Sequence, residues 1–315
     1  MILNKERDTI MPHSQNGSDG SGPAESRGNT RSRPLHSALH PMEGKMKSVI
    51  LYVHDDNGME SRMQAALDIA RADNGHIECV TCKPLTALML TDPFGATFMV
   101  PEAIQAVDEA AERASNLIEK RMAREDVSWS LVEGDGDPAE ILANRGRLAD
   151  LIILSFNHDN DADAAMSQSL VGDVALAAPV PVLAVPGDGR PLALTGTCAI
   201  LWNGSKEAAN AIRAAVPLLK QAASVHLVTI TDEAQEFAAL DAASYLSRHG
   251  IKAEIIAAEK KDGTVMEGLT NAIDQCEAGW IVMGAYSRGP LREWLFGGVT
   301  HDILSRTRIP LFIAH

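Results

Sequence analysis

The sequence predicts an α/β protein built from two similar, doubly wound domains in tandem. From residue 47 onward, short apolar runs alternate with amphipathic stretches of helical periodicity. The same series then occurs a second time, and a Gly- and Pro-rich stretch at residues 186–191 separates the two copies. Strands that alternate with helices imply right-handed βαβ units. Each domain is therefore expected to contain a parallel sheet with helices on both faces.

Length and charge narrow the classes of function. The chain has 315 residues, enough for two domains that each bury a core. It carries 28 Lys and Arg against 42 Asp and Glu, a formal net charge of −14. Sequence-independent binding of a phosphate backbone needs a positive face. Nucleic acid is therefore not an expected partner.

No membrane span or secretory signal is expected. The apolar stretch at residues 174–185 has 12 residues and is interrupted by Pro179 and Pro181, whereas a bilayer span needs about 20. Charged residues near the N-terminus stand where a secretory signal requires an apolar run: Lys5, Glu6, Arg7 and Asp8. A cytoplasmic location follows as the expectation.

The cysteines do not form a convincing metal or redox motif. Cys79 and Cys82 make a C-x-x-C, which is one sign of a zinc or redox site. No second Cys or His pair stands at ligand spacing, and side chains three apart in a strand point to opposite faces. We therefore interpret all four cysteines as buried small hydrophobes in a reducing compartment: Cys79, Cys82, Cys198 and Cys276.

The domain boundaries follow changes in composition. Residues 1–45 contain Gly-Ser-Asp-Gly-Ser-Gly-Pro without apolar periodicity and are predicted to be a disordered tail. The first domain is expected at 46–186, a linker at 187–196 and the second domain at 197–315. Met46 directly precedes the first strand, and one hypothesis is that translation starts there. A peptide from residues 14–27 of the native protein, found by mass spectrometry, would contradict it.

The elements of the first half are expected in the order strand, helix, strand, helix, strand, helix, strand, helix, strand. Asp137 can cap a helix that has Pro138 in its first turn, and Glu140 completes a capping box. The helix before the last strand has no clear bounds. The expected strands are 47–53, 77–82, 127–132, 151–154 and 180–185, and the bounded helices are 60–72 and 102–124.

The second half repeats this series. Val80 and Val228 match at an offset of 148, which also places Asp55 opposite Asn203. Near the domain ends the offset is 129, because the first half carries a longer segment after its second strand. The expected strands are 198–202, 225–230, 251–257, 280–283 and 309–313, and the expected helices are 206–222, 233–248, 265–276 and about 298–306.

Candidate ligand-binding residues lie in two loops of the second domain. In an open parallel sheet, ligands bind beyond the carboxyl ends of the strands. Glycine lets a backbone approach phosphate closely, a helix that opens at Gly298 offers free N–H groups, and Arg288 adds positive charge. The candidates are Asn203, Gly204, Ser205, Gly284, Ser287, Arg288, Gly297, Gly298, Val299 and Thr300.

The spacing in the second loop resembles that of the universal stress protein family. ATP-binding members carry a glycine, two residues, a second glycine, nine residues, then a glycine followed by Ser, Thr or Asn. Gly284, Ser287, Gly297 and Gly298 keep this spacing, with Ser287 in place of the second glycine and Gly298 in place of the small polar residue. The resemblance covers residues 46–315 as a tandem of two such domains.

This resemblance implies a fold and a function. Each domain is expected to have five parallel strands in the order 3-2-1-4-5, and the two domains to form an intramolecular pseudo-dimer. The second domain is expected to bind ATP or another adenine nucleotide, with Mg²⁺ carried by the nucleotide. Nucleotide occupancy would then modulate association with protein partners in a stress response. Whether the tandem dimerises again through its last strands stays open.

The chain departs from the family pattern in both halves. ATP-binding members use an aspartate at the end of the first strand, where this chain has Asn203, whose amide oxygen accepts only an uncharged hydrogen bond. The first half has Asp55 there but lacks the glycines of the motif. The replacing residues are Ser155, His158, Gln168 and Ser169, and the acidic neighbours that would repel a triphosphate are Asp159, Asp161 and Asp163.

Two other functions stay open. One is a nucleotide-free protein-interaction module, in which Asn203–Gly204–Ser205 is only a turn and helix cap and Gly297–Gly298 only a turn. The other is a carrier of a small apolar ligand beneath residues 85–101, which are rich in Leu, Met and Phe without periodicity. No base-and-nucleophile pair or metal cluster can be argued from spacing, so no catalytic residue is assigned and no enzyme is expected.

Overall fold

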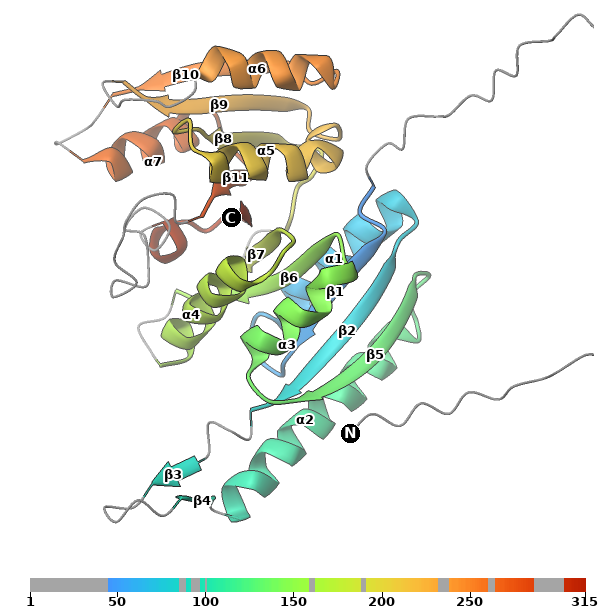
Figure 1. Cartoon of the computed structure of the whole chain (residues 1–315). Coiled ribbons are helices and arrows are strands. Elements are labelled where there is room, and N and C mark those ends of the chain that lie inside the picture. Colours follow the sequence, from blue (N-terminus) through green and yellow to red (C-terminus); the bar gives the residue numbers. More distant parts are fainter. Residues whose placement is uncertain are drawn as a thin grey trace, which may run out of the picture. The chain divides into compact units, whose positions relative to one another are not determined.

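The computed structural model in Figure 1 describes residues 45–84, 89–91, 97–99, 101–158, 162–187, 191–231, 238–259, 264–285 and 303–315. The predicted tail up to residue 44 lies outside this part of the chain, as do most of residues 85–100. Within the described part, no helix is both long enough and apolar enough to cross a bilayer.

The first half forms a parallel sheet whose strands run in the order β5-β2-β1-β6-β7. Strands β1 and β6 are almost entirely buried, because a parallel sheet covered on both faces exposes neither side of its central strands. The strands are β1 (Ser48–Val53), β2 (His76–Lys83), β5 (Ser128–Asp135), β6 (Leu151–Phe156) and β7 (Val182–Pro186). The helices are α1 (Met59–Asp73), α2 (Pro101–Met122), α3 (Pro138–Arg145) and α4 (Ala162–Ala177).

The second half repeats the arrangement, with strand order β10-β9-β8-β11-β12 and parallel pairing throughout. The strands are β8 (Thr197–Leu201), β9 (Ser224–Ile230), β10 (Ala253–Ala258), β11 (Trp280–Gly284) and β12 (Leu311–Ala314). The helices are α5 (Lys206–Leu219), α6 (Ala239–Arg248) and α7 (Val265–Gln275), and residues 303–306 are also helical. The predicted α/β class with two tandem doubly wound domains is confirmed.

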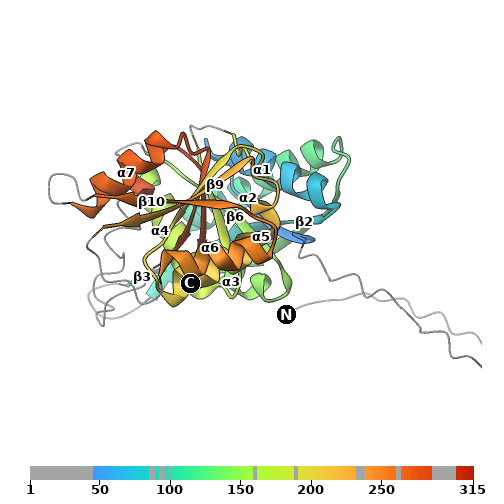
Figure 2. The ribbon, with the colours of Figure 1, turned by 90° about the horizontal axis from the view of Figure 1, so that it is seen from above.

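Two apolar layers cover the two faces of the sheet. One contains buried side chains of α1, α2, α5 and α6, and the other contains those of α3, α4, α7 and residues 303–304. Figure 2 shows α6 and α7 on opposite sides of β9 and β10. Each layer includes residues of both halves, so the halves share a continuous core.

The last strands of the two halves pair with each other. β12 runs antiparallel to β7, with Phe312 opposite Leu183, which joins the strands into one ten-stranded sheet. His158, just after β6, also hydrogen-bonds the carbonyl oxygen of Thr307 through its Nε2. This pairing is the contact expected of an intramolecular pseudo-dimer.

Local sequence chemistry accounts for the start of α3. Asp137 caps the helix by accepting a hydrogen bond from the Glu140 N–H at 3.1 Å, and Pro138 occupies the first turn, as predicted. Residues 85–101 differ from the expectation of no regular structure. Their described part contains an antiparallel hairpin, β3 (Met89–Thr91) and β4 (Thr97–Met99), which the irregular apolar pattern did not indicate.

Trp280, at the start of β11, gives a test of the core. It is fully buried, and its indole Nε1 has no hydrogen-bond partner among the described residues. Trp280→Phe keeps an aromatic ring and removes the unpaired donor, so we expect it to lower the free energy of unfolding by less than about 1 kcal/mol. Trp280→Ala is expected to cost about 3–5 kcal/mol. Urea unfolding measures both, and a Phe variant as damaging as the Ala variant would contradict this expectation.

Candidate functional site

The carboxyl ends of β8 and β11 form the point where the strand order of the second half reverses. β8 pairs with β9 on one side and with β11 on the other, so the connections that leave β8 and β11 lead to different faces of the sheet. Crevices at such switch points are where doubly wound proteins bind ligands. Four of the predicted site residues lie here: Asn203, Gly204, Ser205 and Gly284.

Asn203, Gly204 and Ser205 form the turn that leads from β8 into α5. The side-chain Oδ1 of Asn203 accepts a hydrogen bond from the Ser205 N–H at 3.1 Å. Ser205 is the N-cap of α5, and its Oγ accepts from the Ala208 N–H at 3.2 Å. Gly204 has φ +78°, a conformation that favours glycine. These three residues form a turn and a helix cap, and ligand binding by them stays a prediction.

Gly284, the last residue of β11, lies directly against the first turn of α5. A Cβ at this position would stand 2.4 Å from Ala208 N and 2.5 Å from Glu207 C. Only glycine allows this close approach. The predicted residues that follow in the second loop lie outside the described residues: Ser287, Arg288, Gly297, Gly298, Val299 and Thr300.

The N-terminus of α5 already has an acidic neighbour. The Glu207 side chain is 5 % exposed, and its Oε1 lies 3.4 Å from Lys206 Nζ. A carboxylate in the first turn interacts favourably with the positive end of the helix. It also repels an anion, so α5 alone is a poor phosphate site.

The register of the sheet corrects one equivalence that the sequence suggested. Tyr52 pairs with Val80, and Leu201 pairs with Val228, so Leu201 occupies the position of Tyr52. Asn203 is therefore equivalent to His54 and not to Asp55. The N-cap Gly58 comes six positions after Tyr52, whereas the N-cap Ser205 comes four after Leu201. The loop between the first strand and the first helix is therefore two residues longer in the first half.

One charged residue near the first-half switch point was missed by the sequence reasoning. Arg62 is 1 % exposed and extends from α1 to the ends of β1 and β6. Its position gives a signal, because it shares the apolar face of α1 with Met59, Met63 and Ala66. A charge on a buried helix face needs partners. The predicted acidic cluster Asp159, Asp161 and Asp163 cannot be compared, because its side chains lie outside the described part.

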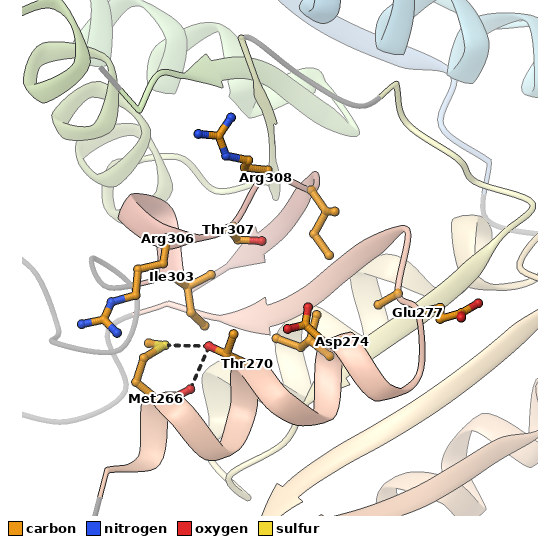
Figure 3. A pocket seen from close by; sticks show the side chains of 11 residues that line it. Met266, Thr270, Asp274, Glu277, Ile303, Arg306, Thr307 and Arg308 are labelled. Carbon is orange, nitrogen blue, oxygen red and sulfur yellow. Dashed lines mark hydrogen bonds between the residues drawn. The ribbon is translucent and has the colours of Figure 1, made fainter. Parts of the chain in front are cut away.

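A groove of about 570 Å³ lies in the second half between α7 and residues 303–309 (Figure 3). It includes the residues just before β11 and β12, at the amino ends of these strands. Arg306 and Arg308 point in different directions in Figure 3, so their guanidinium groups do not converge on one anion. None of the four described site residues lines the groove. The lining comprises Met266, Thr270, Ile273, Asp274, Glu277, Ala278, Ile303, Arg306, Thr307, Arg308 and Ile309.

Three cysteines are buried as predicted, whereas Cys276, just after α7, is only partly buried, which corrects the expectation for that residue. No cluster of metal-ligating groups occurs among the described residues. Burial raises the pKa of Cys79 and of Cys82 to about 12. At pH 8 a thiol with that pKa is ionised in about one molecule in ten thousand. We expect iodoacetamide to modify the half-exposed Cys276 first, and Cys79 and Cys82 only on unfolding. Peptide mass spectrometry checks this, and early labelling of Cys79 or Cys82 would contradict their burial.

The sequence profile of the universal stress protein family matches residues 46–186 and again residues 200–315. The chain belongs to the universal stress protein family. The two matched segments are the two halves of the sheet, so this universal stress protein carries the family domain twice. A search of curated proteins gave no significant match.

Solved structures share the tandem fold of this universal stress protein. A universal stress protein from Archaeoglobus fulgidus has a TM-score of 0.70 at 15 % identity, covering 86 % of this chain and 96 % of its own. A functionally unknown protein from Pseudomonas aeruginosa has a TM-score of 0.56 at 17 % identity, with coverages of 85 % and 92 %. A putative universal stress protein from the same species has 0.55 at 18 %, with 85 % and 93 %. At such identities the similarity concerns the fold.

Proposed function

We propose that the second domain binds ATP or another adenine nucleotide at the carboxyl ends of β8 and β11, and that occupancy modulates association with protein partners in a stress response. The observation that carries this proposal is the contact of Gly284 with the first turn of α5. This contact places Gly284, the first residue of the glycine motif, beside the turn that contains Asn203, at the switch in strand order. The two loops singled out in the sequence thus begin at one crevice.

The proposed roles follow from the chemistry of each loop. Asn203, with Gly204 and Ser205, would contact the ribose or base through amide and backbone groups. The phosphates would be held by Gly284, Ser287 and Arg288 together with residues 297–300, and Mg²⁺ would arrive with the nucleotide. The acidic first turn of α5 supports this division, because it leaves the anion to the second loop. We propose binding without turnover.

Calorimetric titration of ATP with magnesium into the full chain tests the proposal. Micromolar binding is expected for the wild type. Gly297→Val removes a motif glycine that would approach the phosphates and should abolish binding while circular dichroism shows an intact fold. Gln168→Val is the matched control, because Gln168 holds the equivalent position of the first half, where its Nε2 donates to Asn157 O. It should leave the affinity for ATP unchanged.

Other results of these measurements would favour the two alternative functions. Absence of heat and of a thermal shift at millimolar ATP would reject nucleotide binding and favour a protein-interaction module. Equal loss of binding in the Gly297→Val and Gln168→Val variants would show that the effect is not local to the second domain. Binding of a hydrophobic dye that disappears on deletion of residues 88–99, with folding retained, would favour an apolar-ligand carrier.

A further inference from the structure

The first half contains the same switch point, between β1 and β6, but the chain fills it with its own side chain. The guanidinium of Arg62 donates from Nε to the carbonyl oxygen of Tyr52 at 3.1 Å, and from Nη2 to that of His54 at 2.9 Å. Its Nη1 donates to the carboxylate of Asp56 at 3.0 Å and to Ser155 Oγ. These atoms belong to the end of β1, the following loop and β6, so one side chain spans the crevice.

The donors of this guanidinium are fully used. Arginine has five N–H donors. Four have the oxygen acceptors just described, and Nη2 also faces the Sδ of Met59 at 3.7 Å. The Cζ atom lies 5.6 Å from the centroid of the Tyr52 ring, a distance suited to cation–π attraction. Asp56 supplies the compensating charge, with its Oδ1 2.9 Å from Nη1. A fully paired, buried cation is held firmly in place.

The helix position equivalent to Arg62 holds no cation in the second half. Arg62 is four positions after the N-cap of α1, and the residue four positions after the N-cap of α5 is Ala209. Ser155, which bonds Arg62, is replaced by Gly284 in the second half, as the pairing of β6 with β7 and of β11 with β12 shows. The two domains therefore share a switch point, and among the described residues only the first domain places an arginine across it.

We infer that the ligand site of the first domain is occupied by the guanidinium of Arg62, and that the first domain therefore admits no nucleotide. The second domain alone would then bind one, a consequence that rests on the proposed function. The groups around Arg62 are two carbonyl oxygens, a carboxylate and a hydroxyl, all acceptors. Removing the side chain would leave a site that attracts a small planar cation and repels a phosphate.

Chemical rescue tests this inference in the full chain. Arg62→Ala leaves the partly buried carboxylate of Asp56, the carbonyl oxygen of Tyr52 and Ser155 Oγ without their donor, and should lower the melting temperature by about 10 °C. Methylguanidinium at about 10 mM and constant ionic strength should then raise that temperature by about 4 °C, if it binds with a dissociation constant of about 1 mM. Met63→Ala is the matched control, because Met63 is 2 % exposed on the same helix. Its cavity offers no comparable acceptor set, so methylguanidinium should not rescue it.

A measurement on the wild type does not depend on any variant folding. Phenylglyoxal should modify exposed arginines such as Arg113 quickly in the native protein and leave Arg62 unmodified, with or without ATP. Peptide mass spectrometry reads this out. Rapid modification of Arg62, or equal effects of methylguanidinium on the Arg62→Ala and Met63→Ala variants, would overturn the inference.

Counting bound ATP by equilibrium dialysis separates this inference from the proposed function. One ATP per chain, lost in Gly297→Val, supports both. Two per chain, one of them retained in Gly297→Val, overturns the closed first domain. If no ATP binds, the proposed function is rejected. Protection of Arg62 from phenylglyoxal and rescue by methylguanidinium then still decide whether Arg62 occupies the switch point of the first domain.

Discussion

Gly284→Ala is expected to lower the free energy of unfolding by about 3 kcal/mol, the upper end of what overpacking usually costs. The added Cβ would stand 2.4 Å from Ala208 N and 2.5 Å from Glu207 C. Both are backbone atoms of α5, so no rotamer change relieves the clash, and the helix itself must shift. Urea unfolding followed by circular dichroism measures the loss.

Gly279→Ala is the control for this prediction, because it adds a methyl group just before the same strand. The nearest atoms to its Cβ would be Ala193 Cβ at 3.5 Å, Thr197 O at 3.7 Å and Ala193 O at 3.9 Å, which are ordinary contacts. We expect a cost below about 1 kcal/mol. If Gly284→Ala lowered the free energy of unfolding as little as Gly279→Ala does, α5 would not pack against the end of β11. The geometric support for the nucleotide site would then be lost.

The first half has the same close contact between a strand end and a helix N-terminus, but there the glycine belongs to the helix. A Cβ at Gly58, the N-cap of α1, would stand 2.2 Å from Ser155 Oγ and 2.7 Å from its Cβ. Gly58→Ala should therefore be destabilising, and adding Ser155→Gly should recover part of the loss. We expect an interaction free energy of about 1–3 kcal/mol in this double-mutant cycle. Purely additive effects would contradict the contact.

Phe312→Ala is expected to cost about 3–5 kcal/mol and to destabilise both halves together. Phe312 is fully buried in β12, opposite Leu183 of β7, where the two halves pair. It belongs to an apolar layer that contains residues of both halves. Because that layer is continuous, calorimetry should show a single transition that moves to lower temperature.

Leu240→Ala is the matched control for Phe312→Ala, because Leu240 is 69 % exposed on α6. Truncating an exposed leucine should change the free energy of unfolding by no more than about 0.5 kcal/mol. Two separate transitions for Phe312→Ala, with one unchanged from the wild type, would show that the halves unfold independently despite their shared sheet.

The order and type of the elements could be predicted because their signals are local. The cap formed by Asp137, the buried run of β6 and the periodicity of α1 each lie within a few consecutive residues. The described elements agree with the predicted ones to within a few residues at most ends. The hairpin β3–β4 was missed because its strands have three residues each, too few to establish an alternation.

The candidate site was predictable in its location but only partly in its residues. The repeated series and the switch in strand order predict a ligand site at the carboxyl ends of β8 and β11, and both Asn203 and Gly284 lie there. Their local roles depend on atoms far away in the chain. Gly284 is next to α5, some 75 residues earlier, and no local pattern predicts that contact.

By itself, the sequence determined the family, the duplication and the succession of strands and helices, since these depend on composition, spacing and local capping. Only the tertiary structure decided which atoms meet at the strand ends. It made His54 the equivalent of Asn203, and it brought Arg62 to Ser155, 93 residues away along the chain. The physical reason is that strand register and helix packing depend on contacts between residues far apart in the sequence, which short local patterns do not contain.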